Sequence, residues 1–238
     1  MNRNIDELRT LMSISANATE EEIKDTFKSI ANYLKNYSVI KTKDEKYRIL
    51  DFEFYYFNQN HQDIMTHPRN SEALCWYIND FGGIDLNFGS KVEVNNEPIK
   101  KKGIEIYSYK YILSKDSYFG GVLIRQIQRL SDKVIFDGPL KVAELFRTLN
   151  ASHQLQDIPI LIIDPESLEK LEFASPQRHN ILGSHKDITK KVDYNLQSCF
   201  EKIDGSKRAD LIKSFQNIHD EESTNRCYRY CWAGLKAK

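Results

Sequence analysis

The chain has 238 residues, of which 29% are charged and 11% aromatic, and its formal net charge is zero. This composition is typical of a globular protein and excludes the disordered classes. No apolar run approaches the 18 or so residues of a membrane helix, so we expect no membrane span. The N-terminal residues do not resemble a signal peptide, so we expect a cytoplasmic protein, associated with the nucleoid if the source is bacterial. The length of the chain predicts one substantial domain.

The cysteine pattern argues against both a disulfide framework and a metal centre. Four cysteines in a chain this long do not indicate a disulfide-dense scaffold (Cys75, Cys199, Cys227 and Cys231). The spacing Cys227-x3-Cys231 resembles half of a zinc site, but no second pair has metal-ligand spacing. We therefore expect buried thiols, no metal and no other cofactor.

The first 45 residues are expected to be helical. Thr19 and Glu22 have the spacing of a capping box, in which each side chain bonds the backbone of the other residue. The apolar residues that follow have helical spacing (Ile23, Phe27, Ile30, Ala31 and Leu34). This pattern predicts an amphipathic helix that packs on the core.

From Tyr47 the hydrophobic period changes to two, which predicts a strand over Tyr47–Phe57. One face of this strand is wholly apolar and should lie in the core (Leu50, Phe52, Phe54 and Tyr56). The opposite face carries Asp51 and Glu53 among aromatic residues. Ionised carboxylates are costly in such surroundings unless they have a partner or a function, so Glu53 is the first candidate for a functional residue.

The remaining elements predict an α+β fold, with a single antiparallel β core surrounded by N-terminal and peripheral helices. Residues 46–163 should form this core and residues 164–238 a C-terminal part. The predicted elements are a hairpin of Leu74–Ile78 and Ile84–Phe88, a charged excursion or second hairpin over 91–115, a strand at Gly120–Leu130, a helix opened by Asp137-Gly138-Pro139, a buried strand at Ile158–Ile163, a helix containing Leu211, Ile212, Phe215 and Ile218, and a strand at Cys227–Trp232.

Several motifs occur in the order found in one enzyme family. The stretch Arg48-Ile-Leu-Asp-Phe-Glu53-Phe-Tyr55 resembles the catalytic strand of the alkyladenine (3-methyladenine) DNA glycosylase family. The other matching segments follow it in sequence: His67, the stretch from Leu74 to Asn87 that contains Tyr77, Gly121-Val-Leu-Ile-Arg125, and Gly138-Pro139-x-Lys141. The resemblance extends from about residue 26 to about residue 150.

This resemblance implies a monofunctional glycosylase that flips a damaged or modified base out of double-stranded DNA and leaves an abasic site. It assigns Glu53 to orient and deprotonate the attacking water, with Arg125 as its partner; Asp51, on the same face, is the fallback. Tyr55 and Tyr77 would stack on the base, each contributing about 1–3 kcal/mol. His67 would read the base, and Asn87 would exclude wrong bases by shape.

The same resemblance indicates where DNA would lie, and where this chain departs from the family. The family's intercalating tyrosine falls on Asp80, and Phe81 beside it could supply the apolar wedge. Phe54 replaces a small residue, and the excursion over 91–115 is extra. Further DNA-binding candidates are basic side chains (Lys100, Lys101, Lys102 and Lys141), the last at a helix start suited to phosphate.

Three alternatives remain open from the sequence. The same reaction could act on a hypermodified base, such as the glucosylated hydroxymethylcytosine of some phages, as a defence against infection. The chain could instead be a non-catalytic nucleic-acid-binding module. It could also be an RNA or free-nucleotide N-glycosidase, which the zero net charge favours. No obligate protein partner is evident in any of these cases.

Overall fold

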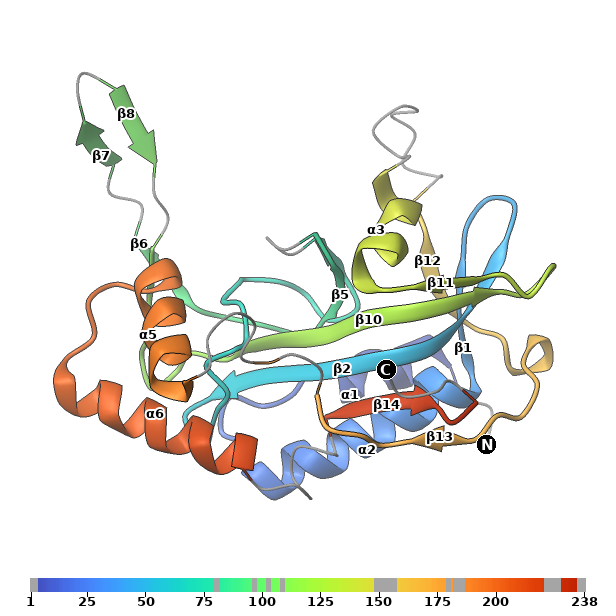
Figure 1. Ribbon diagram of the computed structural model, residues 1–238, viewed down its shortest axis with the longest axis horizontal. Helices are drawn as coiled ribbons and strands as arrows, with labels where there is room; N and C mark the ends of the chain where they lie inside the picture. The colour runs from blue at the N-terminus through green and yellow to red at the C-terminus, as the bar shows by residue number, and fades with distance from the viewer. Residues whose placement is uncertain are drawn as a thin grey trace.

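A computed structural model of the protein describes residues 4–78, 82–95, 98–101, 104–107, 110–147, 158–178, 181, 187–220 and 228–234. The fold is α+β, as predicted, with a curled antiparallel sheet and helices around it (Figure 1). The described helices are α1 (Ile5–Leu11), α2 (Glu20–Asn36), α3 (Pro139–Arg147), α5 (Ile188–Cys199) and α6 (Gly205–Asp220). A short 3-10 helix covers Pro165–Ser167.

The main sheet has ten strands, of which six follow one another in the order β12-β1-β2-β10-β5-β4. Their bounds are β1 (Ser38–Lys41), β2 (Lys46–Asn58), β4 (Trp76–Ile78), β5 (Ile84–Asn87), β10 (Phe119–Arg129) and β12 (Ile160–Ile163). The other four strands join this path from the side: β3 (His61–Gln62), β11 (Ile135–Asp137), β13 (Phe173–Ala174) and β14 (Arg229–Trp232).

Strand β2 is the centre of the sheet. Its partner β10 runs beside it from Tyr47 to Phe57. Because β10 occupies one edge of β2 throughout, the other edge is shared by β1 at the N-terminal end and by β14 in the middle. The C-terminal part of the chain therefore completes the same sheet as the predicted β core.

Helix α2 covers the apolar face of β2. The predicted capping box is present, since the Thr19 side chain accepts from the Glu22 backbone and the Glu22 carboxylate accepts from the Thr19 backbone. The Phe27 ring stacks on Phe54 with 4.5 Å between centroids and meets Tyr228 edge-on at 5.3 Å. These contacts fix the even-numbered residues of β2 in the core, which leaves the odd-numbered residues on the other face.

Two predicted elements differ from the structure. Ser38–Lys41 is a strand rather than part of a helical segment, because Val39 and Ile40 are β-branched and pair with both β2 and β12. The strand predicted as buried at Ile158–Ile163 lies at the end of the sheet order as β12, and 52% of Ile160 is exposed there. A continuous apolar run does not distinguish an edge strand from a central one.

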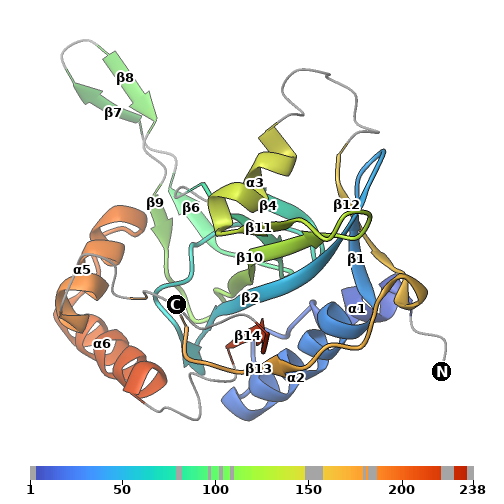
Figure 2. The ribbon, with the colours of Figure 1, turned by 45° about the vertical axis from the view of Figure 1, so that its right-hand side comes forward.

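The charged excursion over 91–115 is confirmed as hairpin structure. Strands β6 (Glu93–Asn95) and β9 (Lys110–Ile112) pair with each other, and β7 (Pro98–Lys101) pairs with β8 (Ile104–Tyr107) beyond them. Figures 1 and 2 both show the β7–β8 hairpin standing away from the main sheet. Lys100 is opposite Glu105 in this hairpin.

Helices α5 and α6 pack on a second apolar cluster at the far end of β2 and β10. In this cluster the rings of Phe57 and Phe119 are stacked at 4.9 Å, and Phe200 and Phe215 are buried beside them. The α6 stripe predicted from the sequence is confirmed, with Leu211, Phe215 and Ile218 buried. None of the described helices is both long and apolar enough to cross a membrane.

Candidate active site

The sheet register brings most of the sequence-predicted site residues onto one face. Directly opposed residues of antiparallel strands point to the same side of a sheet. One such row crosses five strands in the order Arg229, Glu53, Leu123, Asp85, Tyr77. The adjacent row contains Tyr55, Gly121 and Asn87.

Arg125 reaches this face through a β-bulge. Ile124 pairs with Phe52 and Gln126 with Asp51, so Arg125 is the extra residue between them. A bulge bends its strand and changes the direction of the extra side chain. Here it directs the guanidinium to the two carboxylates of β2, with Arg125 Nη1 3.3 Å from Glu53 Oε2.

The Glu53 carboxylate is fully buried and has partners on two sides. Its Oε2 atom accepts a hydrogen bond of 2.8 Å from the Tyr55 hydroxyl, in addition to the contact with Arg125. Its Oε1 atom lies 3.5 Å from Nε of Arg229. The guanidinium groups of Arg125 and Arg229 thus lie on opposite sides of this carboxylate.

Asp51 shares both arginines with Glu53. Arg229 binds it through two hydrogen bonds, Nε to Oδ1 at 3.1 Å and Nη2 to Oδ2 at 2.8 Å, and Arg125 Nε lies 3.7 Å from Oδ2. Burial alone would lower the pKa of Arg229, but its hydrogen bonds and charge interaction with Asp51 outweigh burial and raise it. The two acids and two arginines form a cluster with no net formal charge, and Asp51 makes the shorter contacts with Arg229 in it.

Tyr55 keeps its proton in this site. Burial of its ring, followed by the negative charge of Glu53, raises the pKa of the hydroxyl well above its ordinary value. The hydroxyl is therefore a donor to Glu53 at all ordinary pH values. This bond fixes the orientation of the Tyr55 ring relative to the carboxylate.

Sequence reasoning missed Arg178, which lies against Tyr55 from the C-terminal part of the chain. Its guanidinium carbon is 5.1 Å from the ring centroids of both Tyr55 and Tyr228. Its Nη1 donates to Oδ2 of Asp63 at 2.5 Å, and both side chains are almost completely buried. A single arginine in a loop segment belongs to no sequence pattern, so the sequence does not indicate that Arg178 is part of the site.

Arg69 is a second residue of the face that the sequence analysis did not include in the site. Arg69 forms a buried ion pair of 2.9 Å with Asp85, and its guanidinium carbon lies 4.4 Å from the centroid of the Tyr77 ring. Gly121 makes room for it, because a Cβ at that position would collide with Nη2 of Arg69. Arg69 therefore lies over β10, between the Tyr55 and Tyr77 sides of the face.

The other predicted residues are placed as follows. His67 is half-buried in the loop after β3, two residues before Arg69. Lys141 is exposed in the first turn of α3, and its backbone N–H bonds Gly138 O at 3.0 Å, so this N–H is not available to a phosphate. The Gly138 N–H in turn bonds Arg125 O, which puts the start of α3 beside Arg125.

Some predictions fall outside the described part of the chain. Asp80, Phe81, Lys102 and Cys227 lie outside the described residues, as do the side chains of Lys100 and Lys101. Cys75, Cys199 and Cys231 are free thiols. Cys231 is buried as expected, but Cys75 is exposed and Cys199 is half-buried, so the expectation of buried thiols is wrong for these two. Strand β14 places Cys231 opposite Asp51.

The side chain of His61 is buried, and we expect it to make the stability of the fold sensitive to acid. Burial, then the charges of Arg178 and Lys24, lower the pKa of His61 to about 3. The unfolded chain therefore binds the extra proton between about pH 6.5 and 3, so this residue stabilises the fold above pH 6.5 and loses that effect as the pH falls. The free energy of unfolding should fall by up to about 1.4 kcal/mol per pH unit in this window from His61 alone.

Urea unfolding of wild type and His61→Gln from pH 7 to pH 4 measures this contribution. The variant should have the shallower dependence on pH, since the carboxylates titrate in both proteins. If the free energy of unfolding had the same dependence on pH in both proteins, the folded state would not favour the neutral form of His61.

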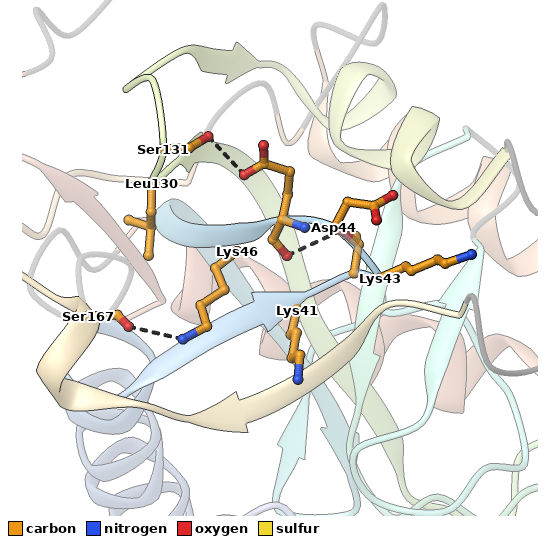
Figure 3. A pocket seen from close by; sticks show the side chains of 9 residues that line it. Lys41, Lys43, Asp44, Lys46, Leu130, Ser131 and Ser167 are labelled. Atoms are coloured by element: carbon orange, nitrogen blue, oxygen red, sulfur yellow. Dashed lines mark hydrogen bonds between the residues drawn. The ribbon is translucent and has the colours of Figure 1, made fainter.

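A separate hollow of about 450 Å³ lies at the β1–β2 turn, at the opposite end of β2 from Asn58 (Figure 3). Its lysines are not arranged as a phosphate site. Lys46 pairs with Asp164 at 2.6 Å, and Figure 3 shows Lys41 and Lys43 extending in different directions. We therefore place the candidate active site on the Glu53 face rather than here.

Comparison with known proteins adds one relationship. The chain is 27% identical over 137 residues to an uncharacterized protein, L759, of Acanthamoeba polyphaga mimivirus. The match covers 51% of this chain and 58% of the viral protein. No protein-family model matches the chain, and no solved structure matches it.

Proposed function

We propose that this protein is a monofunctional DNA glycosylase with an alkyladenine-glycosylase-like fold, which excises a damaged or modified base from double-stranded DNA. The observation that carries the proposal is the position of Glu53, a buried carboxylate held between Tyr55, Arg125 and Arg229. The sequence motifs of the glycosylase family supply the residues of this same face. Glu53, Tyr55, Tyr77 and Asn87 share it with Arg125.

The proposed reaction is hydrolysis of the bond between the base and C1′ of the sugar. A water held by Glu53 attacks C1′, the N-glycosidic bond breaks with its electron pair going to the base, and the proton of the water passes to Glu53. The ionised carboxylate also stabilises the positive charge that develops on the sugar in the transition state. Arg125 and Tyr55 hold the carboxylate in one orientation for this step.

The floor for a flipped base lies on β10. Gly121 and Leu123 lie between the Glu53–Tyr55 side of the face and the Asp85–Asn87 side. Arg69 covers Gly121, so the base would rest on the half-buried Leu123, with its sugar toward Glu53. Neighbouring strands are about 4.8 Å apart, which puts Asp85 about 10 Å from Glu53 across β10. This spacing is wide enough for one base between the two sides of the face. The start of α3 beside Arg125 is where the DNA backbone would pass, with the exposed side chain of Lys141 as its cationic contact.

An abasic-site assay tests the proposal. The protein is incubated with methylated duplex DNA and with glucosylated phage DNA, abasic sites are cleaved with alkali, and strand breaks are counted. We expect breaks in at least one DNA. Breaks that disappear when single-stranded RNA or mononucleotides are added as competitors would favour an RNA or nucleotide N-glycosidase. An absence of breaks in both DNAs would favour a nucleic-acid-binding module.

A further inference from the structure

Both tyrosines that would stack on the flipped base already carry a guanidinium group on one face. Arg69 lies 4.4 Å from the Tyr77 centroid, and Arg178 lies 5.1 Å from the Tyr55 centroid. A cation is attracted to an aromatic face by the ring's quadrupole. A second cation on the other face of the same ring would meet a weakened attraction and the repulsion of the first cation.

Among the described residues, the charges around the face also leave no negative surplus that would attract a cation. Four arginines and four acids are paired within it: Arg69, Arg125, Arg178 and Arg229 with Asp51, Glu53, Asp63 and Asp85. Each acid is already neutralised by an arginine at close range. A positively charged base would therefore gain little on leaving water, where its charge is well solvated.

Arg69 does provide hydrogen-bond donors to a base. Its Nη1 atom is held by Asp85, its Nη2 atom lies over Gly121, and its Nε atom is buried without a hydrogen-bond partner among the described residues. Across the same floor, Oδ1 of Asn87 is also buried without a hydrogen-bond partner among the described residues, while Nδ2 donates to Ser71 at 2.6 Å. A donor and an acceptor are thus both unsatisfied in the row of Gly121, next to Leu123, where the base would rest.

The two classes of base differ in the charge that they carry when they leave the sugar. A base alkylated at a ring nitrogen, such as 7-methylguanine, is cationic in DNA and departs as a neutral molecule. An uncharged base departs with the electron pair of the glycosidic bond and carries negative charge until a proton from solvent neutralises it. A fixed guanidinium at the edge of the base stabilises that charge as it develops.

We infer that the site selects an uncharged base that presents a hydrogen-bond acceptor to Arg69, and that it discriminates against cationic N-alkylated bases. This inference rests on the proposed glycosylase function and names its substrate class. Arg69 is the specificity-determining residue, Asp85 and Tyr77 hold it in place, and Gly121 provides the space that it occupies.

Equilibrium binding to duplexes that resist cleavage tests the inference independently of the reaction. The duplexes carry 2′-fluoroarabino nucleotides with either 7-methylguanine, which is cationic, or 1,N6-ethenoadenine, which is uncharged, and an unmodified duplex is the reference. Wild type should bind the uncharged base about tenfold more tightly than the cationic base. Arg69→Met should remove this preference, because it removes the positive charge that pairs with Asp85 and the donors that face the base.

The chain provides a matched control and a second variant. Arg129→Met removes an arginine that also stacks on an aromatic ring, Phe136 at 5.3 Å, and also pairs with an aspartate, Asp132 at 3.0 Å, but outside the site. It should leave the preference unchanged. Gly121→Ala displaces Arg69 without removing its charge and should weaken the preference, so the inference remains testable where Arg69→Met fails to fold.

Two results would overturn the inference: a wild-type preference for the cationic base or none at all, and binding of both modified duplexes that is no tighter than that of the unmodified duplex. Cleavage of the corresponding natural nucleotides is measured in parallel. A preference for the uncharged base without cleavage would contradict the proposed hydrolysis and leave the recognition of the base standing.

Discussion

Replacing Glu53 by glutamine is expected to lower the single-turnover rate of base excision by a factor of about 10²–10⁴, the usual contribution of a general base. Glutamine has nearly the same shape and still accepts a hydrogen bond from the Tyr55 hydroxyl, but it cannot take a proton from water. The measurement is the rate of abasic-site formation with enzyme in excess over the duplex that wild type cleaves.

Asp51→Asn is the matched control for this experiment. It removes one negative charge from the same strand, two residues away, and from the same pair of arginines, Arg125 and Arg229. We expect a loss of no more than about tenfold, because Asp51 acts on the reaction only through those arginines. Equal losses in the two variants would show that the reaction depends on the charge of the cluster and that Glu53 is not its base.

A second large effect is expected on stability, from the buried pair of Asp63 and Arg178. The side chains of both residues are at most 1% exposed, and Arg178 also packs on Tyr55 and Tyr228. Asp63→Asn leaves the Arg178 charge buried without its carboxylate, which typically costs about 3–5 kcal/mol. Urea unfolding followed by tyrosine and tryptophan fluorescence measures this loss as a lower transition midpoint.

The ion pair of Asp193 and Arg208 is the control for this prediction. Its atoms are as close, at 2.6 Å, but its side chains are 30% and 40% exposed. Water replaces much of what Asp193→Asn removes, so that variant should lose at most about 1 kcal/mol. Comparable losses in the two variants would contradict the view that burial makes the Asp63–Arg178 pair important.

Local patterns in the sequence were sufficient to predict the framework of the site. The alternation along Tyr47–Phe57 separates Phe52 and Phe54 in the core from Asp51 and Glu53 on the other face, and the structure confirms this separation. The structure also confirms the capping box of Thr19 and Glu22 and the apolar stripe of α2. Each of these features depends on residues that are close in the chain and repeat with a fixed period.

The partners of the carboxylates could not be predicted in this way. The direction of the Arg125 side chain depends on a bulge, and simple alternation does not predict where a strand has an extra residue. Arg178 and Arg229 reach the site from segments that are distant in sequence, and Arg69 reaches it from the loop before β4. The contacts of a long flexible side chain do not follow from the periodicity of the sequence, so only the tertiary structure shows these pairs.

The last strand of the sheet has a consequence for the order in which the protein folds. Arg229 meets Asp51 across 178 positions of sequence. During synthesis, the carboxylates of β2 emerge from the ribosome long before Arg229 has been made. A domain can fold completely only when all of its segments have been synthesised. The chain must therefore keep two acidic groups hydrated on an unfinished sheet. The two acids can leave water only once β14 has been synthesised and has paired with β2, so the candidate site is complete only after that point.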